Sequence, residues 1–390
     1  MKGALSHAER NAPKRVLMSN LVDFARGEGD AGHQSALLAN FTAMGHEVRM
    51  LTPGRAGAAA AVARFGARAV VTPSGTALGL PGSFDALWQL PKLLQARCAW
   101  RMNILYVRVT TLCFVQVLVA RALGMRVVVE HNGWTASERR VRGGGALMCA
   151  FERWSQLAAA RHAHRSRCVT SGLARLLTDG GVAPEKIFVV GNGVDLDKFR
   201  VLPTVRAPDA PLRLGFIGLL NPWQGVTTAL AAFAALRSEL ALEFWIAGDG
   251  PLAESLRAEA EALGLADSVR FLGKVAAVDA PAVINQFDIA LAPYTLGRNA
   301  EIGSSAIKVR DYAGCGRPVI AARLPGIVEL EEAGWLFTHT PDDAADLATV
   351  IRRVVALGRS ELAARGALAR DYAEQHFDWR QIARWVIAEC

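Results

Sequence analysis

The sequence has no long uninterrupted apolar run. Its longest apolar stretch spans residues 104–129. Arg108, Arg121 and Arg126 interrupt this stretch, which argues against a membrane-spanning helix. The first thirteen residues also lack the apolar core of a signal peptide. We therefore expect a cytosolic protein.

Cysteine is scarce and scattered. The six cysteines lie at positions 98, 113, 149, 168, 315 and 390, with no Cys-x-x-Cys pair and no histidine at zinc spacing. This pattern indicates buried thiols in a reducing compartment. Repeats and low-complexity tracts are absent too, apart from an alanine-rich run at residues 56–63.

Positive charge is abundant in one half of the chain only. Residues 1–195 hold 24 Lys and Arg against 12 Asp and Glu, a net charge of +12, whereas residues 196–390 carry −4. A basic half predicts an anionic partner, which would be nucleic acid, anionic lipid headgroups or a phosphorylated acceptor. Nucleic acid is the least favoured, because no recognised binding module accompanies the charge. A solvated basic surface is the alternative.

Both halves alternate short apolar strands with helices. In the first half, the strand Arg15–Ser19, a Gly- and Asp-rich loop at 20–31 and the helix Gly32–Met44 lead to the strand Glu47–Leu51. This βαβ pattern predicts a parallel sheet with right-handed crossovers. The other predicted strands are Ala69–Val71, Ile104–Val107, Val127–Val129, Cys168–Thr170, Ile187–Val190, Leu212–Ile217, Phe244–Ala247, Val269–Leu272, Ile289–Ala292 and Val319–Ala321.

A linker is expected at residues 201–211, which contain three prolines and no periodicity. The predicted fold is α/β, with two Rossmann-like, doubly wound parallel-sheet domains, 1–200 and 212–375, that face a cleft. A last helix within 376–390 is expected to pack back on the first domain. Ligands of such sheets bind at the carboxyl ends of the strands.

One segment, residues 301–322, points to a chemistry. Lys308 and Asp311 lie three residues apart, so a helix places them on one face. Gly316 and Pro318 then end the helix before an apolar strand. A helix start binds anions through its free N–H groups, and a carboxylate accepts hydrogen bonds from sugar hydroxyls. The segment therefore predicts a site for a sugar attached to a phosphate.

Several motifs follow one another along the chain. They are Gly45-His46-Glu47-Val48, Gly191-Asn192-Gly193-Val194-Asp195 with Phe199, Phe216-Ile217-Gly218 with Pro222-Trp223-Gln224-Gly225-Val226, Ala247-Gly248-Asp249-Gly250-Pro251 and Val269-Arg270-Phe271-Leu272-Gly273. In these motifs and their order, nearly the whole chain resembles the family 4 glycosyltransferases, retaining enzymes of the GT-B fold. Residues 305–312 resemble the subgroup whose donor loop has Ser-Pro-Leu-Lys followed by Glu-Tyr. The resemblance implies a nucleoside-diphosphate sugar donor, no cofactor and no catalytic metal; Asp195 and Asp197 are then structural.

The resemblance also implies site residues. His131, Lys308 and Glu301 are expected to be catalytic, with His131 at the end of a strand beside Glu130. Asp311 stands where the family has a ribose-binding glutamate. Gly303 occupies the position of a second glutamate, so Glu301 is the nearest acid. The expected donor-binding residues are Gly29, Gly218, Gln224, Gly225, Gly248, Lys274, Val275, Ser304, Ser305, Ile307, Lys308 and Asp311.

The diphosphate grip departs from the family. Leu219 and Gln224 replace the usual arginine and lysine, so Lys308 is expected to carry most of the positive charge, with help from helix-start amides near Gly225. Arg298 and Arg310 are further candidates.

A basic loop holds the expected acceptor or membrane patch, made of Trp134, Arg139, Arg140 and Arg142. A second cluster lies at residues 161–167, and a solvated face is the alternative for both. The acceptor is expected to be a glycan, a lipid-linked glycan or a natural-product intermediate, and the protein is expected to contact an anionic membrane from the cytoplasm. A sugar-nucleotide epimerase, a phosphorylase and a non-catalytic homologue stay open.

Overall fold

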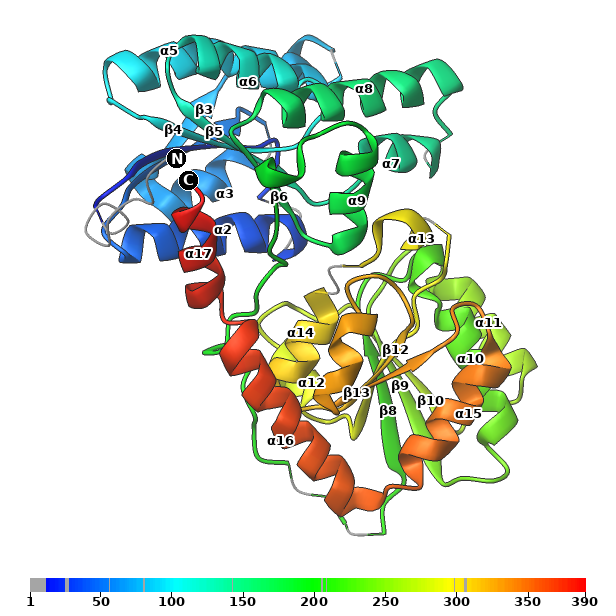
Figure 1. Cartoon of the computed structure of the whole chain (residues 1–390). Helices are drawn as coiled ribbons and strands as arrows, with labels where there is room; N and C mark the ends of the chain where they lie inside the picture. The colour runs from blue at the N-terminus through cyan, green and yellow to red at the C-terminus, as the bar shows by residue number, and fades with distance from the viewer. Residues whose placement is uncertain are drawn as a thin grey trace. The chain divides into compact units, whose positions relative to one another are not determined.

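The computed structural model describes residues 12–24, 28–55, 57–79, 81–141, 143–204, 206–207, 209–297, 299–304 and 307–390. The chain divides into two compact units (Figure 1). Unit 1 comprises Met1–Gly191 and Trp379–Cys390, and unit 2 comprises Asn192–Asp378. Each unit is built on one parallel sheet.

The sheet of unit 1 has seven strands in the order β3-β2-β1-β4-β5-β6-β7. All of its pairings are parallel, as the alternation of strands and helices predicts. The strands are β1 (Arg15–Ser19), β2 (Glu47–Pro53), β3 (Ala69–Thr72), β4 (Ile104–Arg108), β5 (Arg126–His131), β6 (Arg165–Cys168) and β7 (Ile187–Val189).

Alternation along the strands of unit 1 sends side chains to two helix layers. Val16 and Met18 of β1 pack on one layer, and Leu17 between them packs on the other. Figure 1 shows α2, α3 and α17 on one face of the sheet and α5, α6 and α8 on the other. The helices are α2 (Glu28–Ala43), α3 (Ala58–Phe65), α4 (Asp85–Trp88), α5 (Leu90–Cys98), α6 (Cys113–Ala122), α7 (Thr135–Val141), α8 (Ala146–His162), α9 (Ser171–Asp179) and α17 (Trp379–Ala388).

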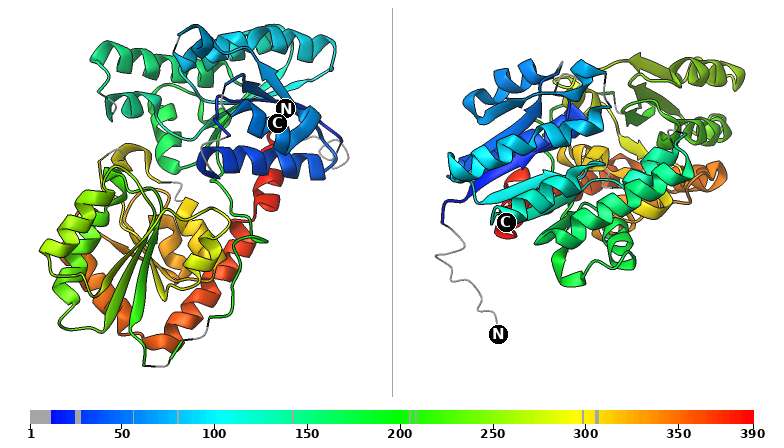
Figure 2. Two further views of the ribbon diagram at one scale, coloured as in Figure 1. Left: turned by 180° about the vertical axis from the view of Figure 1, so that it is seen from behind. Right: turned by 90° about the horizontal axis from the view of Figure 1, so that it is seen from above.

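The last helix of the chain completes the core of unit 1. Trp379, Ile382 and Val386 of α17 lie at helical spacing and are buried. The helix α17 packs beside α2 (Figure 2). Nζ of Lys14, just before β1, donates to the carbonyl oxygen of Ile387 at 2.6 Å. Segments from near the two ends of the sequence therefore meet in one domain.

The sheet of unit 2 has six parallel strands in the order β10-β9-β8-β11-β12-β13. The order reverses between β8 and β11, which is where such sheets bind ligands. The strands are β8 (Leu212–Ile217), β9 (Leu242–Ala247), β10 (Val269–Gly273), β11 (Ile289–Ala292), β12 (Val319–Ala322) and β13 (Leu336–His339). The helices are α10 (Val226–Leu236), α11 (Ala253–Ala262), α12 (Ala280–Ile284), α13 (Asn299–Ile302), α14 (Ile307–Gly314), α15 (Ala344–Val355) and α16 (Gly358–His376).

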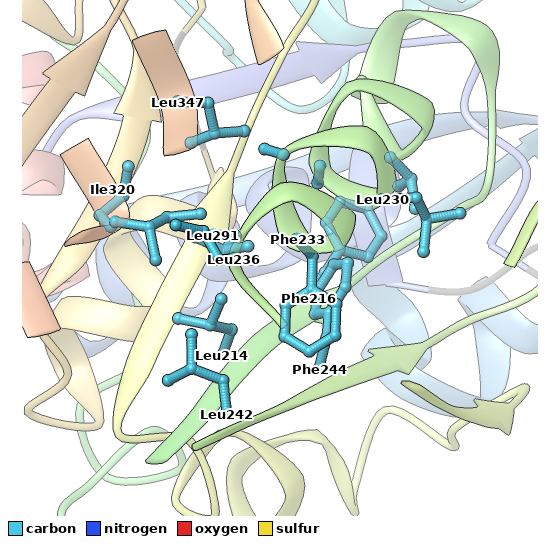
Figure 3. Close-up of a cluster of buried hydrophobic side chains, with 14 of the residues drawn as sticks. Leu214, Phe216, Leu230, Phe233, Leu236, Leu242, Phe244, Leu291, Ile320 and Leu347 are labelled. Carbon is cyan, nitrogen blue, oxygen red and sulfur yellow. The ribbon is translucent and has the colours of Figure 1, made fainter. Parts of the chain in front are cut away.

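A dense apolar core joins the sheet of unit 2 to α10, α11 and α15 (Figure 3). Leu230, Phe233 and Leu236 recur at helical spacing along α10 and are fully buried. They pack with Phe216 and Phe244. The ring centroids of Phe233 and Phe244 are 5.8 Å apart. This core fixes the carboxyl ends of β8 and β9, where the expected donor residues lie.

Two boundaries and one strand differ from the sequence-based expectation. The helix α2 begins at Glu28, so the predicted loop at 20–31 is shorter. The predicted strand at 168–170 lies at 165–168, where Ser166, Arg167 and Cys168 are all buried. The strand β13 (Leu336–His339) was not among the predicted strands.

Candidate functional site

Lys308 lies beside the carboxyl end of β8 in unit 2. It belongs to α14, and its Nζ donates to Oε1 of Gln224 at 2.5 Å. The ammonium also lies 3.8 Å from the ring centroid of Phe216. Burial lowers the pKa of Lys308 well below its usual value, and Asp311 only partly opposes this effect. Within the described residues its hydrogen-bond partner is a neutral amide. A bound anion would offset the cost of burying the ammonium charge.

Tyr312 ties α14 to the strands on both sides of the order reversal. Its hydroxyl accepts from the backbone N–H of Ile217 at 3.0 Å and donates to the carbonyl oxygen of Leu291 at 3.2 Å. Lys308 and Asp311 lie on the preceding turn of the same helix. Their positions relative to β8 and β11 are therefore fixed by a buried side chain.

The start of α10 borders the same place. Gly225 precedes this helix with a φ of +70°, and a Cβ there would lie 1.8 Å from the carbonyl oxygen of Pro293. Only glycine fits this approach. Among the residues that the structure describes, no side chain caps the helix, so its first N–H groups are available to an anion beside Gln224.

The ends of β8, β9 and β10 lie side by side. Gly218 follows β8, and a Cβ there would be 3.0 Å from Nζ of Lys308. Gly248 follows β9, its N–H donates to the carbonyl oxygen of Gly273 at 2.7 Å, and Lys274 follows directly. Lys274 is exposed and Val275 is half-buried. Unit 2 therefore brings together Gly218, Gln224, Gly225, Lys308 and Asp311, with Gly248 one strand farther along.

The expected sugar-binding loop is only partly described. Glu301 is exposed on the short helix α13, Ser304 is half-buried, and Ser305 and Arg298 lie outside the described residues. Gly303 has a φ of +69°, and a Cβ there would lie 2.1 Å from the carbonyl oxygen of Pro325. The backbone at Gly303 therefore excludes the glutamate that the family resemblance leads one to expect.

His131 ends β5 in unit 1 and is fully buried. The side-chain amide of Gln156 holds it: Nε2 donates to the carbonyl oxygen of Gly133 and lies 3.1 Å from Nδ1 of His131, while Oε1 accepts from Thr135. Nδ1 is then an acceptor, so the proton of the neutral ring is on Nε2. Burial lowers the pKa of His131 to about 3, despite the neighbouring Glu130. His131 is consequently a neutral hydrogen-bond donor at physiological pH and a poor base.

Glu130, beside it, is held in a buried ion pair. Its Oε2 lies 3.0 Å from Nη1 of Arg167, and its Oε1 accepts from Nε2 of Gln34 at 2.8 Å. His33 is 3.3 Å away, and the hydroxyl of Tyr106 donates to the same carboxylate. Arg167 was expected on an exposed basic face; it is fully buried because β6 is an interior strand of the sheet. Glu130 is therefore structural in this arrangement.

A cavity of about 390 Å³ opens in unit 1 beside the ends of β1, β2 and β4. Glu152 of α8 is 2% exposed and accepts from Arg139 at 2.7 Å and from Thr111 at 2.9 Å. Its Oε2 and Nε of Arg55 have no hydrogen-bond partner within the described residues. The cavity is lined by Leu21, Arg55, Pro81, Gly82, Ser83, Val109, Thr110, Thr111, Thr135, Glu138, Arg139 and Glu152. The sequence pointed to Arg139 alone among these, because Arg55 and Glu152 lie in separate segments without a motif.

The other predicted residues are dispersed. Trp134 is 5% exposed and belongs to the interior, Arg140 is exposed on α7, and Arg142 lies outside the described residues. Gly29 is in the first turn of α2 rather than in a loop. Oδ1 of Asp195 accepts from two backbone N–H groups, as expected for a structural turn.

Over the described ranges, no group of three or more His, Cys, Asp or Glu is placed to hold a metal ion. Over the same ranges, no helix is both long enough and apolar enough to cross a bilayer.

Two Rossmann-like domains, each built on one parallel sheet, are the architecture of the GT-B fold, and comparison with known proteins agrees. Residues 33–198 match the model described as "Glycosyltransferase Family 4", and residues 211–356 match "Glycosyl transferases group 1". Each half of the chain is thus similar to a glycosyltransferase domain, and the predicted fold class is confirmed.

Solved structures share the fold. Anabaena Alr3699/HepE, solved in complex with UDP, superposes with a TM-score of 0.73 over 95% of this chain and 98% of its own, at 18% identity. WaaG, a glycosyltransferase involved in lipopolysaccharide biosynthesis, has a TM-score of 0.68 over 95% of this chain and 99% of its own, at 16% identity.

Curated relatives match over shorter lengths. The putative colanic acid biosynthesis glycosyltransferase WcaL of Escherichia coli (strain K12) is 29% identical over 52% of this chain and 50% of its own. A D-inositol 3-phosphate glycosyltransferase of Saccharomonospora viridis is 32% identical over 51% of this chain and 48% of its own. The chain therefore spans about half the length of the curated relatives it matches.

Proposed function

We propose that the protein is a retaining glycosyltransferase, which moves a sugar from a nucleoside-diphosphate sugar to a hydroxyl group of an acceptor. The observation that carries this proposal is the ammonium of Lys308, which is desolvated, bonded to the neutral Gln224 and set beside an uncapped helix start. Such a site favours a diphosphate over an uncharged ligand.

The donor is proposed to lie along the carboxyl edge of the sheet of unit 2. Its diphosphate contacts Lys308, Gln224 and the first N–H groups of α10, and its ribose contacts Asp311. Its base lies near Lys274 and Val275. Support comes from the Anabaena protein, which was also solved in complex with UDP-glucose.

The transferred sugar is proposed to lie near Glu301, Ser304, Ser305 and Ile307. The backbone excludes a side chain at Gly303, so an acid for the sugar hydroxyls comes from another position. Glu301 is the nearest candidate, two residues earlier in the chain.

Departure of the nucleoside diphosphate develops negative charge on its phosphates. Lys308 and the amides of α10 stabilise this charge, and removal of one such group costs about 10²–10³ in kcat. Because they supply the positive charge, the proposed step needs no metal ion, and a chelator is expected to leave the transfer rate unchanged. Neither His131 nor Glu130 is a competent base, so the departing phosphate oxygen takes the proton of the acceptor on the same face of the sugar, which gives retention.

The acceptor is proposed to enter the cavity of unit 1. Its charged lining residues are two arginines, Arg55 and Arg139, and two glutamates, Glu138 and Glu152, so their charges cancel. Unsatisfied donors and acceptors on Arg55 and Glu152 suit hydroxyl groups, which both donate and accept. The proposed acceptor end is therefore an uncharged polyol such as a glycan, free or linked to a lipid.

The test measures thermal stability against UDP, GDP, dTDP and ADP sugars. Wild type is expected to gain about 2.7 kcal/mol with one nucleotide family at about 100 times its dissociation constant, whereas Lys308→Met gains nothing. Lys92→Met is the matched control, because Nζ of Lys92 donates to Oε1 of Gln95 at 2.7 Å on the surface of unit 1. An equal gain in Lys308→Met would overturn the donor site.

The absence of any shift with folded wild type would instead favour a non-catalytic homologue. That second candidate draws support from Gln224 and the 57% exposed Leu219, which take the places of two charged residues. An acceptor-dependent release of nucleoside diphosphate would exclude a non-catalytic homologue and argue against an epimerase or a phosphorylase.

A further inference from the structure

The helix α8 of unit 1 presents an apolar stripe to solvent. Leu147, Phe151 and Trp154 follow one another at helical spacing and are 90%, 38% and 50% exposed. The opposite face of the helix is buried and includes Cys149 and Glu152. Isolated exposed apolar residues are ordinary, but three on one stripe form a contiguous surface.

The stripe continues onto α6, which packs against α8. The ring of Phe114 meets that of Trp154 edge-on at 5.1 Å, and Phe151 stacks on Trp154 at 5.9 Å. Leu118, one turn after Phe114, is 43% exposed. Phe114, Leu118, Leu147, Phe151 and Trp154 are called the α6–α8 patch below. Ring contacts hold its aromatic side chains in place before any partner binds.

The exposed charges on α6 and α8 have one sign. The only acid on α6 or α8 is Glu152, which is 2% exposed and bonded to Arg139. Arg121 on α6 and Arg153 and Arg161 on α8 are all exposed. The patch is therefore apolar and aromatic, and the exposed charges on its two helices are positive.

We propose that the α6–α8 patch docks the protein on a membrane surface that contains anionic lipid. Aromatic and leucine side chains enter the boundary between headgroups and acyl chains, while arginines meet the anionic headgroups. A second copy of the chain fits the patch less well, since a two-fold contact would place the arginines of both copies together. Trp134, which the sequence suggested for this purpose, is in the interior, and Trp154 takes its place.

Binding to sedimented vesicles tests the apolar component. Wild type is expected to bind vesicles of equal parts phosphatidylglycerol and phosphatidylcholine, and not phosphatidylcholine alone. Leu147→Ser and Trp154→Ser are each expected to weaken binding about tenfold or more, because the side chain no longer enters the lipid. Val278→Ser, which changes a 77% exposed apolar residue of unit 2, is the matched control and is expected to bind as wild type.

A second pair of variants tests the charge. Arg153→Ser is expected to weaken binding about fivefold, and Arg353→Ser, on an exposed position of α15, to leave it unchanged. Leu147→Ser tolerates the change without loss of packing, since its side chain is almost free. Wild-type binding by Leu147→Ser and Arg153→Ser would overturn the proposal. So would a dimer of wild type that Leu147→Ser dissociates, since the occupant would then be a second copy.

Discussion

Replacement of Glu130 by Gln is expected to destabilise unit 1 by about 3 kcal/mol, the lower end of the range of about 3–5 kcal/mol for breaking a buried ion pair. Glu130 and Arg167 have no exposed surface, and the pair is joined at 3.0 Å. The substitution leaves the guanidinium buried without its counter-charge. Arg167 keeps hydrogen bonds to the carbonyl oxygens of Val190, at 2.9 Å, and Gly191, at 2.6 Å, which limits the loss.

A double-mutant cycle isolates this pair. Arg167→Met strands the carboxylate at a similar cost, whereas the double variant removes both charges and is expected to cost about 2–3 kcal/mol less than the sum of the single changes. Hydrogen exchange of β5 and β6 amides reports the free energy of unfolding of unit 1 apart from unit 2. Arg15→Met, which is also in unit 1, is the control, because its ion pair with Glu47 is nearly half exposed and is worth about 1 kcal/mol or less.

The pH dependence of the stability that Glu130 contributes is a second, independent test. Burial alone raises the pKa of Glu130, but Arg167 and His33 outweigh it and hold the pKa well below 4.5. The stabilisation is fully present above about pH 4.5 and is lost as the pH falls through the lower pKa of the folded state. The difference between wild type and Glu130→Gln should be constant from about pH 7 to 5 and shrink below about pH 4.5. Additive single costs, or a difference that does not depend on pH, would refute the reasoning.

Three further outcomes are expected. Gly225→Ala should destabilise unit 2 by about 3 kcal/mol or more, because the new Cβ clashes with Pro293. Gly45→Ala should cost only about 1 kcal/mol, because its Cβ meets no described atom within 4 Å. Equal losses of stability in chemical denaturation would contradict this prediction. A bound diphosphate raises the lowered pKa of Lys308, so binding should take up a proton, and the affinity should fall as the pH rises toward 10.5. Calorimetry in buffers of different ionisation heat measures this proton uptake, which should be absent in Lys308→Met. The ring of His131 should show no titration by NMR from about pH 5 to 8, since its pKa is about 3; a midpoint near 6.5 would contradict its burial.

Local pattern was enough for the elements that carry the donor site. The strand Leu212–Ile217 and the helix Val226–Leu236 lie at the predicted residues. Their apolar side chains recur at the spacing of a strand and of a helix, and these side chains form the core of unit 2. Lys308 and Asp311 lie on one helix as their spacing predicted. The spacing of residues in the sequence does not reveal that the carbonyl oxygen of Pro325 lies next to Gly303 and excludes a side chain there.

Tertiary placement decided what the sequence left ambiguous in unit 1. Local composition does not separate a buried tryptophan or arginine from an exposed one. Trp134 is buried and Trp154 is half exposed, although arginines lie near both in the sequence. The cavity was missed for a related reason: Arg55 and Glu152 come from the loop after β2 and from α8, and only the fold brings them together.

The net charge of +12 in the first half counts buried and exposed arginines alike. The positions of the glutamates show which arginines are neutralised by an ion pair and which leave their charge on the surface. Glu130 and Glu152 face Arg167 and Arg139 inside the domain, so positive charge is left on the outer surface of α6 and α8. Glu130→Gln therefore raises the net charge by one without changing the surface that a membrane meets. Its binding to anionic vesicles is expected to equal that of wild type at temperatures where it is folded, while Arg153→Ser binds about fivefold more weakly. Tighter binding by Glu130→Gln would mean that total charge, and not the placement of arginine on α8, governs the contact.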